Sequence, residues 1–256
     1  MKRILMAHQV AGFPSDEVAL RISDALVEGG AQILEIQLPF SDPSADGPAI
    51  QTACSRVLER GYTVEEGFDF ISAIHRKHPQ ITIFLMTYAS LAYARGIENF
   101  VEDGKKAGVK GFIIPDLPFD CDEGLALACK KAGLYQIPVV APSMSSERLE
   151  TIQRGGYEYL YCALRAGITG SKTSITEDSI NFLKQAGKGN SKLLGGFGIV
   201  NGEQAAAVSP YVYAIVAGSV FVNLIRNTVE KKEVAVENFS EMYKQLSAKA
   251  AELSGL

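Results

Sequence analysis

Apolar residues recur along this chain in short runs, and segments with helical spacing separate the runs, which is the pattern of strands alternating with helices. We expect a strand at each run. Eight such runs lie at residues 3–10, 32–38, 81–86, 110–115, 136–140, 158–163, 192–196 and 212–217.

The first two intervening segments carry start and stop signals for helices. Ser15 is placed to cap a helix that Gly29-Gly30 would stop. Thr63 and Glu66 have the spacing of a capping box at the start of another helix. The expected apolar faces of these two helices comprise Val18, Ile22, Leu26, Phe68, Ile71 and Ile74.

The same joining pattern repeats further along the chain. Lys106-Ala107-Gly108 and Lys131-Ala132-Gly133 each read as a cationic helix end that a glycine stops before the next strand. Residues 236–253 have apolar positions at helical spacing and predict a closing helix. These joins indicate repeated helix-to-strand units.

The alternation of eight strands with helices favours an α/β fold, a single (βα)8 TIM barrel over residues 1–256. A doubly wound sheet would have about six strands and a Gly-x-Gly-x-x-Gly turn after the first of them. The first turn here, Ala11-Gly12-Phe13-Pro14, lacks that fingerprint.

The strand at 32–38 holds an acid among apolar neighbours. Leu34, Ile36 and Leu38 would face the helices, so Glu35 would point into the barrel near the carboxyl end of its strand. A carboxyl group buried there is suited to donate and accept protons near neutrality. The loop that follows offers further carboxylates at Asp42 and Asp46, and the active sites of such barrels lie at this end.

Glycines cluster after the last three strands, at Thr169-Gly170-Ser171, Gly195-Gly196-Phe197-Gly198 and Ala217-Gly218-Ser219. Loops after the seventh and eighth strands of such barrels, joined by a short helix starting near Ser219, form a phosphate site from backbone N–H groups. With aromatic residues at other strand ends, this favours a substrate with one anionic end and one flat apolar end.

Composition narrows the class of protein. The net charge is -4 and the basic residues are dispersed, so the sequence predicts no basic patch that would bind nucleic acid or an anionic membrane. The four cysteines and three histidines lack the spacing of metal ligands, so we expect no metal site. The apolar start of the chain is too short for a signal peptide, and we expect a cytoplasmic protein without a membrane span.

Motifs in the same order and at compatible spacing resemble those of the tryptophan synthase α chain family over nearly the whole chain. The most specific is the one around Glu35 and Asp46. The motifs are Leu34-Glu35, Pro39-Phe40-Ser41-Asp42-Pro43, Ala45-Asp46-Gly47-Pro48, Asp116-Leu117-Pro118, Arg165-Ala166-Gly167-Ile168-Thr169-Gly170, Gly196-Phe197-Gly198-Ile199 and Gly218-Ser219.

The resemblance implies a lyase of tryptophan biosynthesis that cleaves indole-3-glycerol phosphate to indole and glyceraldehyde 3-phosphate. It makes Glu35 the acid and base and Asp46 the carboxylate that stabilises the ring N–H. It implies no cofactor in this chain and a heterotetrameric αββα complex with a β chain that would carry PLP.

The resemblance also implies supporting residues. Tyr161 would lie near Glu35, and Thr169 would orient Asp46 when its loop closes. The expected phosphate-binding residues are Gly170, Gly198, Gly218 and Ser219. The expected indole-pocket residues are Phe40, Tyr88, Phe197 and His8.

The chain departs from the family pattern at three positions. Gln37 replaces a usual glycine, His8 an aromatic residue, and Ser90 an asparagine, and an N-terminal helix that covers the barrel in most members is expected to be missing. His8 could act as a second acid or base, although an interior histidine with satisfied hydrogen bonds is the favoured interpretation. Alternatives to the α chain are a free-standing indole-releasing lyase and a non-catalytic activator of the β chain.

Overall fold

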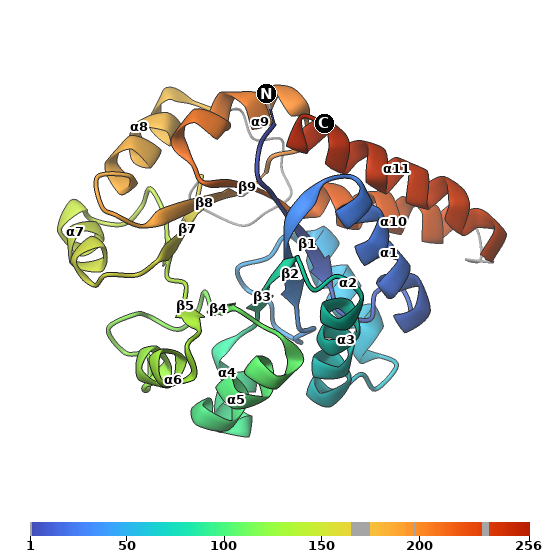
Figure 1. The fold of residues 1–256 in the computed structure, drawn as a ribbon, viewed down its shortest axis with the longest axis horizontal. Helices are drawn as coiled ribbons and strands as arrows, with labels where there is room; N and C mark the ends of the chain where they lie inside the picture. The colour runs from blue at the N-terminus through green and yellow to red at the C-terminus, as the bar shows by residue number, and fades with distance from the viewer. Residues whose placement is uncertain (1, 165–174, 197, 232–235) are drawn as a thin grey trace.

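The computed structural model describes residues 2–164, 175–196, 198–231 and 236–256. Parallel strands form a ring, and helices surround it (Figure 1). The strands are β1 (Leu5–Val10), β2 (Ala31–Gln37), β3 (Thr82–Met86), β4 (Gly111–Ile113), β5 (Tyr135–Gln136), β6 (Val139–Val140), β7 (Tyr159–Ala163), β8 (Lys192–Gly196) and β9 (Ala214–Ala217).

The nine strand segments fill the eight predicted strand positions. The sheet order is β5-β4-β3-β2-β1-β9-β8-β7-β6, and β5 and β6 are the two ends of one run around Pro138. The N–H of Ile137 donates to Phe112 O at 2.9 Å, and the N–H of Tyr161 donates to Pro138 O at 2.9 Å. The run therefore bonds to β4 at its start and to β7 at its end, which joins the two ends of the sheet. The strand is interrupted at Pro138 because proline has no backbone N–H to donate to a neighbouring strand.

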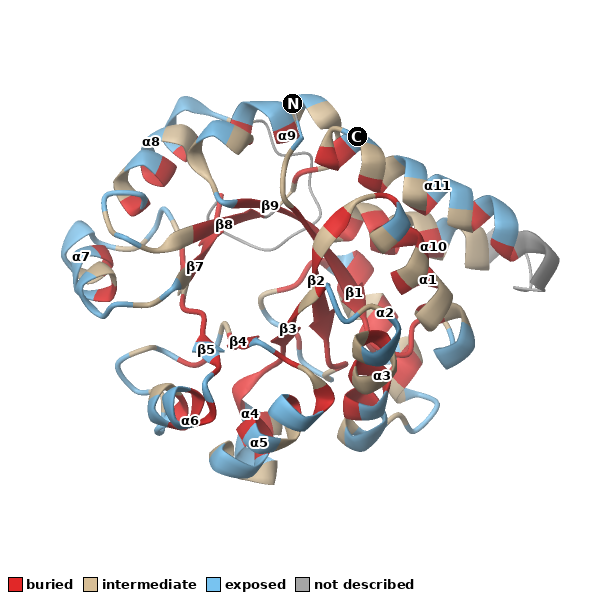
Figure 2. Ribbon diagram, in the orientation of Figure 1, coloured by how far each residue is buried: buried red, intermediate tan, exposed pale blue. Residues whose placement is uncertain are grey.

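The helices lie outside the ring and turn their buried faces toward it (Figure 2). They are α1 (Asp16–Glu28), α2 (Pro48–Leu58), α3 (Val64–Lys77), α4 (Ala89–Arg95), α5 (Ile97–Ala107), α6 (Leu125–Ala132), α7 (Ser146–Arg154), α8 (Glu177–Ala186), α9 (Gly202–Val208), the 3-10 helix η1 (Ser209–Tyr211), α10 (Ser219–Lys231) and α11 (Val236–Ser254).

Most of the predicted helix ends are confirmed. Thr63 and Glu66 form a capping box on α3, and Gly108 and Gly133 end α5 and α6 in the left-handed conformation. Ser15 is the N-cap residue of α1, but its side chain makes no capping hydrogen bond, so that part of the prediction is wrong. The helix that starts at Ser219 spans 13 residues and is not the short helix expected there.

Alternate positions of each strand pack into two separate layers. The outward residues join the helices in one large cluster, and the inward residues fill the lumen as a second cluster. On β2, Leu34 and Ile36 belong to the outer layer, as does Leu38 beyond its end, whereas Ile33 belongs to the lumen. Glu35 shares the parity of Ile33 and is 3% exposed, so its predicted inward direction is confirmed.

The two ends of the described chain meet next to the amino end of β1. Arg3 N donates to Ser254 O at 2.7 Å, and the Ser254 hydroxyl donates to Gly29 O at 3.2 Å. Residues 2–4, the described part of the chain ahead of β1, form no helix. The last turn of α11 is thereby fixed to the start of β1 and the end of α1.

Candidate active site

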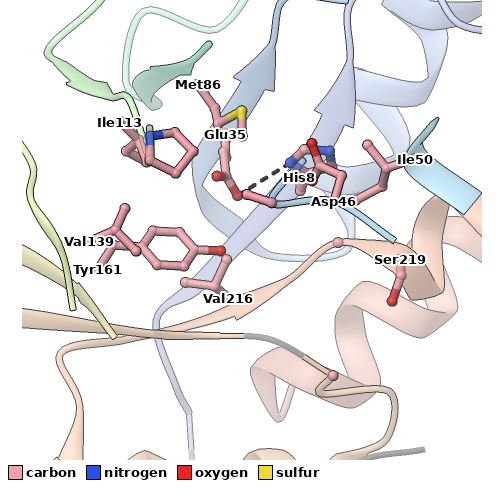
Figure 3. Close-up of a pocket in the computed structure, with 14 residues that line it drawn as sticks. His8, Glu35, Asp46, Ile50, Met86, Ile113, Val139, Tyr161, Val216 and Ser219 are labelled. Carbon is pink, nitrogen blue, oxygen red and sulfur yellow. Dashed lines mark ion pairs between the residues drawn. The ribbon is translucent and has the colours of Figure 1, made fainter. Parts of the chain in front are cut away.

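A cavity opens at the carboxyl ends of the strands, where the sequence places the active site (Figure 3). Polar side chains and glycines gather on part of its wall, and apolar side chains form the rest. The described lining comprises His8, Glu35, Ala45, Asp46, Ile50, Met86, Ile113, Pro115, Val139, Tyr161, Gly198, Val216, Gly218 and Ser219.

Glu35 extends into this cavity beside His8 (Figure 3). The two residues are partners in the parallel register of β1 and β2, so adjacent strands present them side by side. His8 Nδ1 lies 3.3 Å from Glu35 Oε2, and both side chains are at most 5% exposed. Burial lowers the pKa of His8, but the hydrogen bond and charge of Glu35 and the charge of Asp46 raise it above the usual histidine value.

Asp46 reaches the same cavity from the loop after β2. Its Oδ2 accepts hydrogen bonds from the Tyr88 hydroxyl at 2.7 Å and from Gln37 Nε2 at 2.8 Å. Gln51 Nε2 donates to the backbone carbonyl of Asp46 at 2.8 Å, which fixes the loop itself. Burial raises the pKa of Asp46, while the His8 charge and the bonds from Tyr88 and Gln37 act in the opposite direction. The carboxylate is oriented by one donor at the end of β2 and one at the start of α4.

Two of the glycines predicted to bind phosphate, Gly198 and Gly218, line the cavity. Gly198 follows β8 with a φ of 101°, and Gly218 stands immediately before Ser219, the first residue of α10. A Cβ added at Gly218 would lie 3.2 Å from His8 Cβ, so a larger residue would crowd that ring. The start of α10 offers backbone N–H groups to an anion, and the described lining contains no Lys or Arg.

Tyr161 projects from β7 into the cavity and is 8% exposed. Burial, with the nearby charges of Glu35 and Asp46, raises its pKa well above the usual tyrosine value, so the phenol stays protonated. A Cβ at Gly196 would lie 3.1 Å from the Tyr161 hydroxyl, and glycine there leaves room for the ring.

The remaining predicted site residues fall into two groups. Phe40 and Tyr88 stack with ring centroids 5.1 Å apart, next to the lumen cluster, and Tyr88 contacts Asp46. Their place in the indole pocket stays a prediction, because neither belongs to the described cavity lining. Thr169, Gly170 and Phe197 lie outside the described residues.

Sequence reasoning missed the contact between Gln37 and Asp46. The available signal was parity, since Gln37 stands two residues after Glu35 and therefore points to the same side of β2. The apolar part of the wall was also missed, although most of these residues stand at inward positions of strand ends. These are Ile50, Met86, Ile113, Pro115, Val139 and Val216.

Two further observations bear on the class of protein. Across the parts of the chain that the structure describes, no group of three His, Cys, Asp or Glu side chains is placed to hold a metal ion. Within the same parts, no helix is both long and apolar enough to cross a bilayer. The fold and the cavity define a (βα)8 barrel in which two buried carboxyl groups and a glycine-containing wall line one cavity.

Comparisons with known proteins specify the family. The model of the family described as "Tryptophan synthase alpha chain" matches residues 1–251. The tryptophan synthase alpha chain of Helicobacter hepaticus is 38% identical over 98% of this chain and 95% of that protein, and that of Methanosarcina acetivorans is 37% identical over 89% and 84%.

A solved structure agrees with these sequence matches. It concerns mutual activation in the tryptophan synthase α2β2 complex of Pyrococcus furiosus, and it superposes with a TM-score of 0.88 at 28% identity over 100% of both chains. The chain belongs to the tryptophan synthase alpha chain family, whose members are lyases that cleave indole-3-glycerol phosphate in tryptophan biosynthesis.

Proposed function

We propose that Glu35 is the proton donor and acceptor for this family's reaction, cleavage of indole-3-glycerol phosphate to indole and glyceraldehyde 3-phosphate. Breaking the carbon–carbon bond requires a proton on C3 of the indole ring and removal of the proton from the neighbouring side-chain hydroxyl. The observation that carries the proposal is the 3% exposed Glu35 carboxyl group in one cavity with Asp46 and the glycine-lined start of α10.

Asp46 stabilises the intermediate in this proposal. Protonation of C3 places positive charge on the ring nitrogen, and a fixed carboxylate near that N–H lowers the energy of the charged ring. The bonds from Tyr88 and Gln37 hold Asp46 Oδ2 in place before the substrate arrives, so little reorganisation is needed during the reaction. The two acids thereby take different roles from different surroundings.

The rest of the cavity supplies binding. Gly198, Gly218 and Ser219 would hold the phosphate through backbone N–H groups, together with Gly170. The apolar wall would enclose the flat indole ring. Tyr161 would pack beside the reacting atoms as a neutral phenol, and Thr169 would orient Asp46.

The proposal extends to the protein's partner and setting. The Pyrococcus furiosus protein assembles as an α2β2 complex, and we infer that this chain, acting as one domain, pairs with a β chain in the same way. PLP would belong to the β chain, and this chain would work in the cytoplasm without a cofactor of its own. The Pyrococcus furiosus chain matches this one along its whole length, which supports a partnership of the same kind.

A turnover assay with and without a tryptophan synthase β chain tests this function. We expect slow release of indole from indole-3-glycerol phosphate by the chain alone and faster release when the β chain is added. Equal, fast release in both cases would identify a free-standing lyase. Absence of release in both would identify a non-catalytic activator and contradict the proposal.

A further inference from the structure

His8 has an unusual position for a residue that only forms a wall. It is 4% exposed, and its ring shares the cavity with the carboxyl groups of Glu35 and Asp46 (Figure 3). Nδ1 is paired with Glu35, whereas Nε2 is buried and has no hydrogen-bond partner among the described residues. The ring is therefore not an interior histidine with both nitrogens satisfied by the part of the chain that the structure describes.

Few of the described residues face His8 from neighbouring elements. Glu35 on β2 and Asp46 on the following loop carry the charges that act on it. Tyr161 on β7 shares the cavity as a neutral phenol, and β9 and the start of α10 present the uncharged Val216, Gly218 and Ser219. A proton on His8 is therefore stabilised mainly by the two acids that the reaction uses.

We propose that His8 is a positioning residue for Glu35, which holds Glu35 Oε2 through its Nδ1–H and shares a single exchangeable proton with that carboxyl group. The inference rests on the proposed role of Glu35. The geometry supports it, because the strand register fixes the two side chains as neighbours and both side chains are at most 5% exposed.

The proton movement balances without any added reactant. When His8 gives its proton to Glu35, the Nδ1–H bond breaks, an O–H bond forms at Oε2, and both charges disappear. Glu35 then protonates C3 of the indole ring, and its carboxylate takes the hydroxyl proton as the carbon–carbon bond breaks. Return of that proton to Nδ1 restores the ion pair. The pair is active when it holds one proton and inactive when it holds two or none.

The pH dependence of kcat and KM for indole release tests this proposal. In the wild-type enzyme, His8 keeps one proton in the pair up to the pH at which the imidazolium is lost, and Glu35 raises the pKa of that imidazolium. In His8→Gln, Glu35 must hold the proton by itself. We expect the alkaline limb of kcat to move to lower pH by one unit or more, a loss of about tenfold or greater at pH 8, with KM within about threefold.

Several controls make the outcome decisive. His78→Gln makes the same chemical change at a histidine paired with Asp24 at 2.7 Å, outside the described cavity lining, and should leave the limb unmoved. His8→Phe removes both ring nitrogens and should shift the limb as His8→Gln does. An unchanged alkaline limb in both His8 variants would overturn the proposal and leave His8 as part of the wall.

A second measurement does not depend on how the His8 variants fold. The chain has only three histidines, so NMR can follow the titration of each imidazole in the intact protein. We expect the His8 pKa to fall in Glu35→Gln, and an unchanged value would contradict the shared proton. If Glu35→Gln releases indole at the wild-type rate, the proposed function fails. If Glu35→Gln is inactive but the alkaline limb of kcat is the same in the His8 variants and in wild type, the proposed function stands and only the role of His8 fails.

Discussion

At the residue scale, the two buried acids differ in what they contact. Asp46 accepts bonds from a phenol and an amide, both neutral donors, which fix its direction. Glu35 faces an imidazole that can carry a proton. Neutral donors favour the charged form of Asp46, which suits a carboxylate that must stay ionised. A titratable ring beside Glu35 can exchange a proton with it, which suits a group that must gain and lose one.

Asp46→Asn should keep the shape of the side chain and remove its charge. We expect kcat for indole release to fall by about 10²- to 10³-fold, the scale of one electrostatic stabiliser of a charged intermediate. Steady-state kinetics with indole-3-glycerol phosphate measure this directly. Activity within a few-fold of wild type would exclude the role assigned to Asp46.

Tyr88→Phe should change the pH dependence. The Tyr88 hydroxyl stabilises the charged form of Asp46 and so lowers its pKa, and removal of the bond should raise that pKa further. The carboxylate is then lost at a higher pH as the solution is acidified, so the acid limb of kcat/KM should move to higher pH. Tyr93→Phe, at an exposed tyrosine of α4, serves as the matched control. An acid limb at the same pH in Tyr88→Phe and wild type would count against this electrostatic account.

At the element scale, parity and capping signals predicted the parts that depend on local sequence. The inward direction of Glu35 and the capping box of Thr63 and Glu66 follow from periods and spacings that a single strand or helix fixes. The contact of His8 with Glu35 depends on the register between two strands, and that of Gln37 with Asp46 depends on the path of a loop. Parity places Gln37 on the inward side of β2 but does not say which group it meets, and it does not give the register between strands, so the partners in these two contacts could not be predicted.

Two glycine helix ends allow a paired test of stability. Gly133 ends α6 with a φ of 72°, and an added Cβ would meet nothing within 4 Å. Gly108 ends α5 with a φ of 98°, but an added Cβ would lie 2.3 Å from His75 Cγ. We expect Gly133→Ala to lower the free energy of unfolding by about 1–2 kcal/mol, the cost of a left-handed conformation. Gly108→Ala should lose about 1–3 kcal/mol more through overpacking.

Urea denaturation of both variants measures these losses from the shift in the transition midpoint. The relevant quantity is the difference between the two variants, because both place a Cβ on a left-handed residue and only Gly108→Ala adds a close contact. Equal losses would show that His75 moves aside freely, and the packing part of the explanation would be wrong.

At the scale of the whole molecule, the closed ring brings distant parts of the chain to one place. His8, Glu35, Tyr161 and Gly218 come from four strands or their ends, and they meet only because the sheet curls through all its strands. The alternation of strands and helices predicted that closure, and the interruption at Pro138 did not prevent it. The family match covers residues 1–251 and therefore includes every strand that contributes to the cavity.

The most direct test of the central claim is indole release by Glu35→Gln, measured together with its affinity for indole-3-propanol phosphate, a phosphate ester that cannot be cleaved. Glutamine keeps the size of the side chain and cannot transfer the proton. We predict no detectable indole release and an affinity for the ester close to that of wild type. Release at the wild-type rate by a folded variant that still binds the ester would contradict the account.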